Sequence, residues 1–275
     1  MAFSRRRSPA TERRTMVRRG ARSRPRLRPA TNVRGWDGQN MRRAKNSVRN
    51  DPGQYDRLAG EWWKPRGSFA ALHWLARSRA DLIPAPARRG LTLVDLGCGG
   101  GLLATHVGAY RHVGVDLSAR SLRHAVRHGV VPLRADAAAL PLRDGVADVL
   151  VAGELFEHVA DLPTVIAEIA RVLRPDGVLV FDTINDTLWS RLSLVVVGER
   201  VPGGPPPLIH DPALFVRPGR LADLLGRHGF RVRVRGLRPS LRDYAGFLLG
   251  RRDSVRMVPT RSLASVYQGV GKKAS

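Results

Sequence analysis

Apolar and polar positions follow two different spacings from residue 91 onward, and together they predict a fold. Short apolar runs indicate strands, and apolar residues three or four positions apart indicate helices. The predicted strands are Leu91–Leu96, Val113–Val115, Val130–Arg134, Val146–Ala152, Val178–Asp182 and Phe230–Val234. The predicted helices are Leu102–Ala109, the segment from Ser118 towards His128, Leu162–Leu173 and Arg220–His228. This alternation predicts an α/β fold with a Rossmann-like, doubly wound and mostly parallel sheet.

Two segments do not follow the strand–helix alternation. Residues 51–83 precede the first strand and are predicted to be helical, with four clustered aromatic side chains, Trp62, Trp63, Phe69 and Trp74. Residues 185–218 follow the fifth strand as an insertion. Insertions at the carboxyl ends of strands lie over the ligand crevice in open α/β sheets. Both segments are therefore expected to form a lid.

The first 46 residues are rich in Arg, Pro, Ser and Gly and show no apolar periodicity. Such a segment cannot bury enough surface to offset the entropy lost on ordering, so residues 1–46 are predicted to be a disordered tail. An Arg-rich, acid-poor N-terminus also fits a transit peptide. The alternatives to a transit peptide are a plain solvated tail and a true translation start at Met41. Residues 47–275 are predicted to form one domain.

The net charge of +24 would ordinarily suggest nucleic acid or an anionic membrane as a partner. However, residues 1–50 carry 16 Lys and Arg side chains against two acidic ones, and the whole chain has only four lysines. So strong an excess of arginine is consistent with GC-rich coding. The basic tail also lacks interleaved aromatic residues for base stacking. No specific nucleic-acid partner is expected, and an RNA-binding protein that uses the tail is the alternative from another class.

Cysteine content and hydropathy limit the cellular setting. Cys98 is the only cysteine, which excludes an intramolecular disulfide. The chain has no apolar run of roughly 18 residues or more and no apolar N-terminal signal segment. A cytoplasmic protein is therefore expected.

A glycine-rich turn follows the first predicted strand, with the spacing Asp95-x-Gly97-x-Gly99-x-Gly101. Glycines let the backbone approach a ligand closely, and free N–H groups at the following helix point into the turn. Asp116 ends the second strand, where a carboxylate can accept hydrogen bonds from ribose hydroxyls. These features predict a nucleotide-type cofactor at the turn.

The residues around the turn favour S-adenosylmethionine over a dinucleotide. The strict G-x-G-x-x-G pattern fails from Gly97, and the looser form that starts at Gly99 places the turn two residues too late. Asp95 precedes the first glycine, where it could hold the ammonium group of the methyl donor. Asp136 follows the third strand, where an acid could reach the adenine amine.

Several segments between Asp51 and the mid-230s resemble the ubiquinone-biosynthesis O-methyltransferases, with looser similarity as far as Lys272. They are Tyr55-x-x-Leu58-Ala59-x-x-Trp62-Trp63, Gly67-x-Phe69, Leu72-His73, Val94–Gly101, Gly153–Val159 and His210-Asp211-x-x-x-Phe215-x-x-Pro218. The glycine loop occurs in many methyltransferases, whereas the Trp-Trp segment combined with Glu-x-x-Glu-His is much more specific. The resemblance implies a seven-stranded class I methyltransferase domain that methylates a phenol or quinol hydroxyl of a lipophilic small molecule.

The resemblance also implies roles for individual residues. Arg79, Gly97 and Asp116 match family positions that contact the cofactor. Gly153 stands where the family has a methionine against the adenosine, so that apolar contact is lost here. The family's metal-binding Glu-x-x-Glu-His matches Glu154, Glu157 and His158.

Glu154, Glu157 and His158 follow the fourth strand at the functional edge of the sheet. Two carboxylates and an imidazole could bind Mg²⁺, which would make a bound hydroxyl easier to deprotonate. Alternatively, His158 acts as a general base without metal, with Glu157 beside it. In a third interpretation the two glutamates only cap the next helix. Both chemical interpretations make these residues candidates for catalysis.

The apolar run at residues 188–197 is too short to span a bilayer but suits an interfacial position. The resembling family uses this region for peripheral attachment, which implies contact with the inner face of a membrane. Packing as a lid helix on the protein's own core is the alternative. A glycan or secondary-metabolite hydroxyl is the alternative acceptor.

Overall fold

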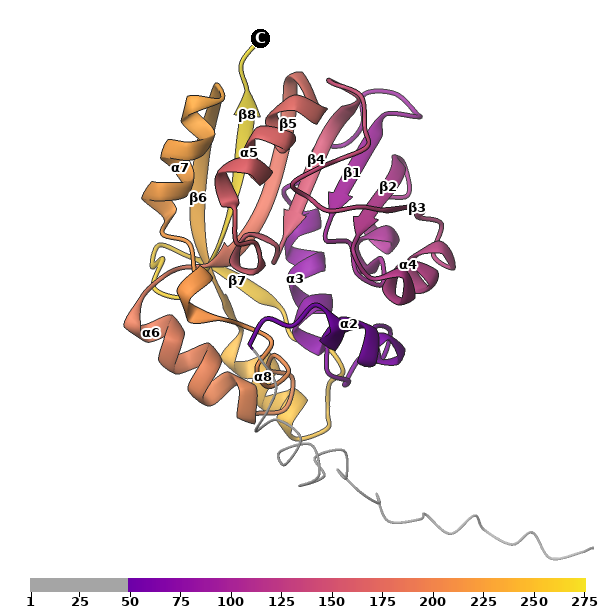
Figure 1. The fold of residues 1–275 in the computed structure, drawn as a ribbon. Coiled ribbons are helices and arrows are strands. Elements are labelled where there is room, and N and C mark those ends of the chain that lie inside the picture. Colours follow the sequence, from indigo (N-terminus) through magenta and orange to yellow (C-terminus); the bar gives the residue numbers. More distant parts are fainter. Residues whose placement is uncertain (1–48) are drawn as a thin grey trace, which may run out of the picture. The chain divides into compact units, whose positions relative to one another are not determined.

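The computed structural model describes residues 49–275, and the predicted tail at 1–46 lies outside this range (Figure 1). The sheet has eight strands in the order β3-β2-β1-β4-β5-β8-β6-β7. The first five are β1 (Thr92–Leu96), β2 (Arg111–Asp116), β3 (Val131–Arg134), β4 (Ala147–Gly153) and β5 (Leu173–Ile184). These five pair in parallel, so their carboxyl ends meet at one edge. The Rossmann-like prediction is confirmed.

The C-terminal third of the sheet is antiparallel. Strand β8 (Val266–Lys273) lies between β5 and β6 (Phe230–Pro239) and runs opposite to both. A short strand, β7 (Met257–Thr260), pairs with the end of β6. It brings the number of strands to eight where seven were expected. Chain order reverses between β1 and β4, and ligands of open α/β sheets bind outside such a switch point.

Helices cover both faces of the sheet. They are α2 (Gly53–Arg57), α3 (Ala70–Ala80), α4 (Ala119–Val126), α5 (Leu162–Val172), α7 (Pro218–Arg227) and α8 (Leu241–Leu248). Alternate residues of a strand point to opposite faces. Val94 and Leu96 therefore pack in the cluster that contains residues of α5 and α7, while Leu93 packs in another with Leu103. Figure 1 shows α5 and α7 together on the near face.

Two predicted elements differ in the structure. Instead of a helix over Leu102–Ala109 there is a single 3-10 segment, η3 (Leu102–His106), which starts from Gly101 in the left-handed conformation. The fifth strand begins at Leu173 rather than Val178, directly after α5. Pro175, Asp176 and Gly177 therefore form an irregular start of the strand, where its register with β4 shifts.

The insertion is helical for most of its first half. It begins with α6 (Leu188–Ser190) and continues as the π-helical η5 (Arg191–Val197) and the 3-10 segment η6 (Gly198–Arg200). A second 3-10 segment, η7 (Pro212–Leu214), leads into α7. In Figure 1 the strands of the parallel sheet point towards α2, α6 and α8, so the insertion lies at the predicted edge. Within residues 49–275, the helices are all too short or too polar to cross a membrane.

Candidate active site

A cavity of about 680 Å³ opens at the carboxyl ends of the strands, and most of its lining is apolar. It is lined by side chains from α3, the glycine turn, the insertion and α8, including Trp74, Leu103, Val201 and Tyr244. The predicted site residues that line it are Arg79, Asp95, Gly97, Gly99, Asp116, Asp136, Gly153, Glu154 and His158. Gly101 and Glu157 are not among the lining residues. The cavity therefore brings most of the predicted residues to one place.

The glycine turn has the conformation that its sequence predicts. Gly97, Gly99 and Gly101 have φ angles of 68°, 52° and 78°, which side-chain-bearing residues adopt at a cost. The carboxylate of Asp116 accepts hydrogen bonds from the backbone N–H of Gly99 at 2.8 Å and of Ser118 at 2.8 Å. Asp116 therefore ties the turn to the start of α4 while its carboxylate still borders the cavity.

The Trp-Trp segment packs directly on the glycine turn. A Cβ on Gly99 or Gly100 would overlap the Trp62 ring. Trp62 Nε1 donates to Ser121 Oγ at 2.9 Å, and Trp63 Nε1 donates to the carbonyl of Gly100 at 2.9 Å. The two tryptophans thus hold the turn in place. The close packing of Trp62 leaves no room for a side chain at Gly99 or Gly100.

The remaining predicted carboxylates differ in burial. Asp95 is buried, and its Oδ2 lies 3.3 Å from His112 Nε2 on the neighbouring strand. Asp136 is exposed and accepts a hydrogen bond from the backbone N–H of Ala138. Asp95 therefore has a fixed, buried position in the cavity wall, whereas Asp136 is exposed to solvent.

Arg79 and Asp182 form a buried, bidentate ion pair beside the cavity. Arg79 Nε and Nη2 donate to the two carboxylate oxygens of Asp182 at 2.6 and 2.7 Å. A Cβ on Gly153 would overlap the Arg79 guanidinium. The expected methionine side chain could not be accommodated at position 153 with Arg79 in this position. Arg79 therefore occupies the space that a side chain at position 153 would need.

The turn after β4 holds the candidate catalytic residues. Glu154 has a φ of 50°, and its backbone N–H donates to Asp182 Oδ1 at 3.0 Å. Glu157 is fully buried, with Oε2 accepting from Thr183 Oγ1 at 2.7 Å. Burial and the neighbouring carboxylates raise the pKa of Glu154 well above its ordinary value. Burial likewise raises the pKa of Glu157, to about 7.

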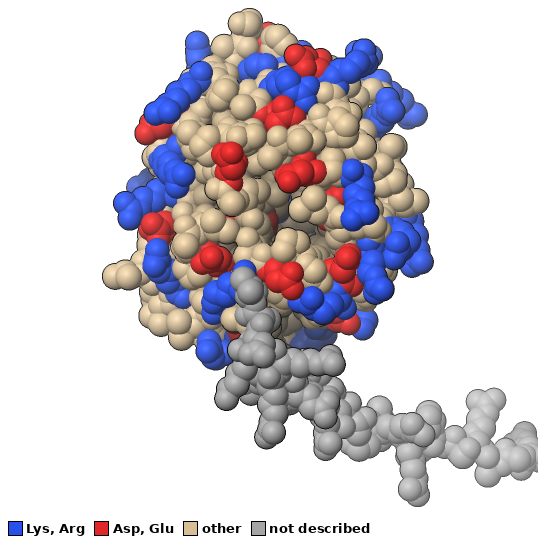
Figure 2. All heavy atoms as spheres, in the orientation of Figure 1, with Lys and Arg blue, Asp and Glu red and all other residues tan. Residues whose placement is uncertain are grey.

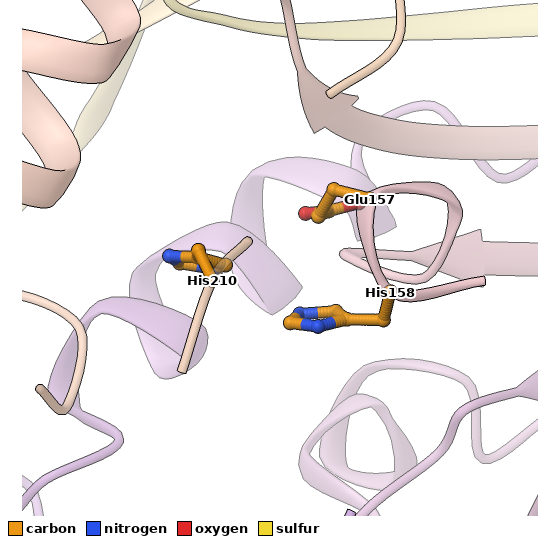
Figure 3. A group of neighbouring side chains, drawn as sticks. All are labelled: Glu157, His158 and His210. Carbon is orange, nitrogen blue, oxygen red and sulfur yellow. The ribbon is translucent and has the colours of Figure 1, made fainter. Parts of the chain in front are cut away.

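Figure 3 shows Glu157, His158 and His210 around one point, with His210 supplied by the insertion. The two imidazole rings stack with centroids 5.2 Å apart. One potential ligand atom of each of the three residues lies within 4.8 Å of the others. Burial lowers the pKa of His158 to about 4, and burial and His158 lower that of His210 as well. Both imidazoles are therefore neutral near pH 7 and retain a lone pair.

Comparison with known proteins places this geometry in a family. A family model described as a methyltransferase domain matches residues 94–181. A ubiquinone biosynthesis O-methyltransferase of Ralstonia nicotianae is 36% identical over 203 residues, which cover 69% of this chain and 82% of that protein. One of Burkholderia thailandensis is 34% identical over 195 residues, covering 67% of this chain and 84% of that protein. The chain belongs to the ubiquinone-biosynthesis O-methyltransferase family. It is an S-adenosylmethionine-dependent methyltransferase.

Solved structures agree on the fold of this methyltransferase. A S-adenosylmethionine-dependent methyltransferase of Thermotoga maritima, described as a possible histamine N-methyltransferase, has a TM-score of 0.57 and 20% identity, covering 80% of this chain and 95% of that one. Phosphoethanolamine N-methyltransferase 2 of Haemonchus contortus, in complex with S-adenosyl-L-methionine, has a TM-score of 0.53 and 15% identity, covering 84% and 61%. The class I fold is therefore shared with enzymes of different acceptors.

Three residues at the site of the methyltransferase were not identified as site residues from their sequence positions. In the sequence, Asp182 only ends a predicted strand, His210 only belongs to a motif shared with the family, and Asn50 belongs to no motif. Each acts through a partner more than 50 positions away in the chain. An acidic residue at the end of the fifth strand was the available signal for Asp182.

We expect Asp116→Asn to weaken S-adenosylmethionine binding by about 10- to 100-fold, because hydrogen bonds to a charged group contribute about 1.5–3 kcal/mol. The amide keeps one acceptor oxygen, but its NH₂ group then faces the second backbone N–H, so the thermal midpoint should fall as well. Calorimetric titration measures the affinity. Unchanged affinity would remove Asp116 from the cofactor site.

Proposed function

We propose that this enzyme transfers the methyl group of S-adenosylmethionine to a phenol or quinol hydroxyl of a lipophilic acceptor. The observation that supports it most is the position of His158, a neutral imidazole in the lining of a largely apolar cavity that the glycine turn also borders. An apolar cavity suits a lipophilic molecule, and an imidazole nitrogen in its wall suits removal of a hydroxyl proton.

The proposed reaction uses two groups of residues, one that binds the cofactor and one that accepts the proton. Arg79, Asp95, Gly97, Gly99, Gly101, Asp116, Asp136 and Gly153 form the proposed cofactor site. Bound S-adenosylmethionine supplies the methyl carbon, and its sulfur takes the electron pair of the broken carbon–sulfur bond. His158 accepts the acceptor's hydroxyl proton as the oxygen forms its bond to that carbon. Glu157, when ionised, lies close enough to stabilise the resulting imidazolium.

The acceptor class is tested with a panel of hydroxyl compounds. We compare a catechol bearing one isoprenoid unit, the same catechol without the chain, and a simple sugar, each with methyl-labelled S-adenosylmethionine. Burial of a single CH₂ group contributes about 0.8 kcal/mol, so the isoprenoid unit should raise kcat/KM by about tenfold or more. Faster methylation of the sugar would favour a glycan or secondary-metabolite hydroxyl as the acceptor.

A divalent cation is the second way to activate the hydroxyl. The predicted ligands were Glu154, Glu157 and His158, but the group that can converge on one point contains His210 in place of Glu154. Glu157 Oε1 and His210 Nδ1 are buried without a hydrogen-bond partner among residues 49–275. These residues fit a cation, and two imidazoles with one carboxylate suit Mn²⁺ or Zn²⁺ better than Mg²⁺.

Cation binding is tested by titrating Mn²⁺ and Mg²⁺ into the full chain without cofactor. If Glu157, His158 and His210 hold the ion, His210→Ala should lose most of the Mn²⁺ affinity and Glu154→Gln should keep it. Loss in Glu154→Gln alone would instead favour the ligand set predicted from the sequence. No binding of either ion, with full methyl transfer in EDTA, would leave His158 as a metal-independent base.

Peripheral membrane contact is proposed for the start of the insertion. Apolar side chains there are unusually exposed, with Leu188 at 87% and Trp189 at 58%. On α8, Leu241 is 75% exposed. Figure 1 shows α6 and α8 at the same end of the molecule as the strands' carboxyl ends. An apolar surface at that end would let a lipophilic acceptor reach the cavity from a bilayer.

We expect Leu188→Ser combined with Trp189→Ser to reduce binding to anionic phospholipid vesicles by about tenfold or more, because each apolar side chain contributes about 1.5–3 kcal/mol when fully buried. Co-sedimentation measures binding. Val131→Ser, at another exposed apolar position on β3, serves as the control. Equal binding of all variants would show that the insertion does not contact the bilayer.

The face shown in Figure 2 does not favour a polyanionic partner. In Figure 2, Lys and Arg side chains lie mainly around the edge of this face, while its middle carries acidic and uncharged side chains. Phosphate backbones bind where basic side chains gather. This distribution agrees with a small-molecule acceptor.

A further inference from the structure

Asn50 holds His158 from two directions at once. Its Nδ2 donates to the backbone carbonyl of His158 at 3.0 Å, and its Oδ1 lies 2.7 Å from the ring nitrogen Nδ1 of His158. The backbone N–H of Asn50 donates to the carbonyl of Leu208 at 3.0 Å. A single residue at the edge of the cavity thus links the turn after β4 to the insertion.

These contacts fix the orientation of the Asn50 side chain. A backbone carbonyl can only accept hydrogen bonds, so the amide nitrogen must face the carbonyl of His158. The amide oxygen then faces Nδ1, and because that oxygen can only accept, Nδ1 must carry the ring proton. In a neutral imidazole the other nitrogen, Nε2, then carries the lone pair.

The freed lone pair points at a hydroxyl group. Tyr55 Oη lies 3.3 Å from His158 Nε2, and with Nδ1 protonated the tyrosine must be the donor. Both Tyr55 and His158 line the cavity. Because Nε2 has one lone pair, an acceptor hydroxyl takes the place of Tyr55 Oη when it binds there.

The backbone at Asn50 is held in an uncommon conformation. Its φ is 58°, in the left-handed region, which asparagine tolerates better than most residues. The preceding residue, Arg49, anchors the segment by donating to Glu199 at 2.9 Å and to the carbonyl of His210 at 2.8 Å. Such conformations persist only where surrounding contacts hold them, and they are concentrated at functional sites.

We propose that Asn50 is a positioning residue that holds His158 as the Nδ1-protonated tautomer and aims Nε2 at the acceptor hydroxyl. The inference rests on the proposed function of His158. It applies equally whether Nε2 takes a proton or a cation, because both need the lone pair on that nitrogen. Metal-bound and catalytic histidines commonly depend on such a partner at the opposite ring nitrogen.

Two variants separate the tautomer from the rest of the contact. Asn50→Gly keeps the left-handed backbone and removes both side-chain hydrogen bonds. Asn50→Asp also loses the donor to the His158 carbonyl but keeps an acceptor for the Nδ1 proton. Gln54→Ala is the control, because Gln54 also links this segment to the insertion, through Pro207, and does not contact His158.

The primary readout is the ¹⁵N chemical shifts of the His158 ring in the full chain without cofactor or acceptor, assigned by comparison with His158→Ala. We expect a protonated Nδ1 and an unprotonated Nε2 in the wild type, Asn50→Asp and Gln54→Ala, and a mixture of tautomers in Asn50→Gly. In the assay, kcat of Asn50→Gly should fall by about 10- to 100-fold, the usual effect of losing such a partner, with KM for S-adenosylmethionine unchanged. Asn50→Asp should restore most of kcat.

An unprotonated Nδ1 in the wild type, or an unaltered tautomer in Asn50→Gly, would overturn the role of Asn50. Equal loss of kcat in Asn50→Gly and Asn50→Asp would also overturn it, because only the lost link to the backbone is common to both. These results differ from failure of the proposed function, which would appear as full activity in His158→Ala.

Discussion

His158→Ala should lower kcat for methyl transfer by about 10²- to 10⁴-fold, the usual contribution of one general base. The imidazole lines the cavity, carries a lone pair near pH 7 and has the carboxylate of Glu157 close by. His210 lines the same cavity, but the contact with Tyr55 Oη marks His158 Nε2 as the ring nitrogen that a hydroxyl group can reach. Affinity for S-adenosylmethionine should not change, because His158 is not among the proposed cofactor residues.

The measurement is steady-state kinetics with a catechol acceptor, combined with calorimetric titration of the cofactor. His228→Ala is the control, since His228 is an exposed histidine at the end of α7. Full activity in His158→Ala would show that proximity and orientation alone account for the rate. A parallel loss of cofactor affinity would instead show that the substitution disturbs the turn after β4.

Asp182→Ala should lower the free energy of unfolding by about 3–5 kcal/mol, because it leaves the buried Arg79 guanidinium without its hydrogen-bonded carboxylate partner. Asp182 is fully buried, Arg79 is 7% exposed, and the two share two hydrogen bonds. For a domain of this size each kcal/mol corresponds to about 2–4 °C in Tm, so a fall of about 6–20 °C is expected. Cofactor binding should weaken as well, since Arg79 borders the cavity.

The matched control is Asp144→Ala, which removes the ion pair between Asp144 and Arg171. The Asp144 side chain is 81% exposed. Exposed pairs contribute about 0–1 kcal/mol, so Tm should change by no more than about 4 °C. Replacing Arg79 and Asp182 together with leucine should recover part of the lost stability, because no charge is then left unpaired. An unchanged Tm in Asp182→Ala would contradict the buried ion pair.

The parts of the site that depend on local spacing could be predicted from the sequence. The glycine turn, the acid at the end of β2 and the Ser118 cap of α4 all lie where the pattern indicates. Each depends on conformational preferences within a few residues of itself. The same holds for the order of strands and helices from β1 to β5.

Contacts between distant segments could not be predicted. His210 reaches Glu157 and His158 because the insertion folds back over the turn after β4, and Asn50 reaches His158 across 108 positions. The C-terminal strand was also missed. It carries Gly269 and Gly271, whose small size accommodates Phe181 and Phe230 side chains on neighbouring strands and conceals the apolar alternation of a strand.

The central claim is that the acceptor hydroxyl loses its proton at His158. It is tested most directly by a crystal structure of the full chain with S-adenosylhomocysteine and an isoprenoid catechol. The account predicts a catechol oxygen within about 2.6–3.2 Å of His158 Nε2, the reach of a general base. The isoprenoid chain should lie in the apolar cavity. A catechol oxygen beyond the reach of His158, and paired with another residue in a productive geometry, would contradict it.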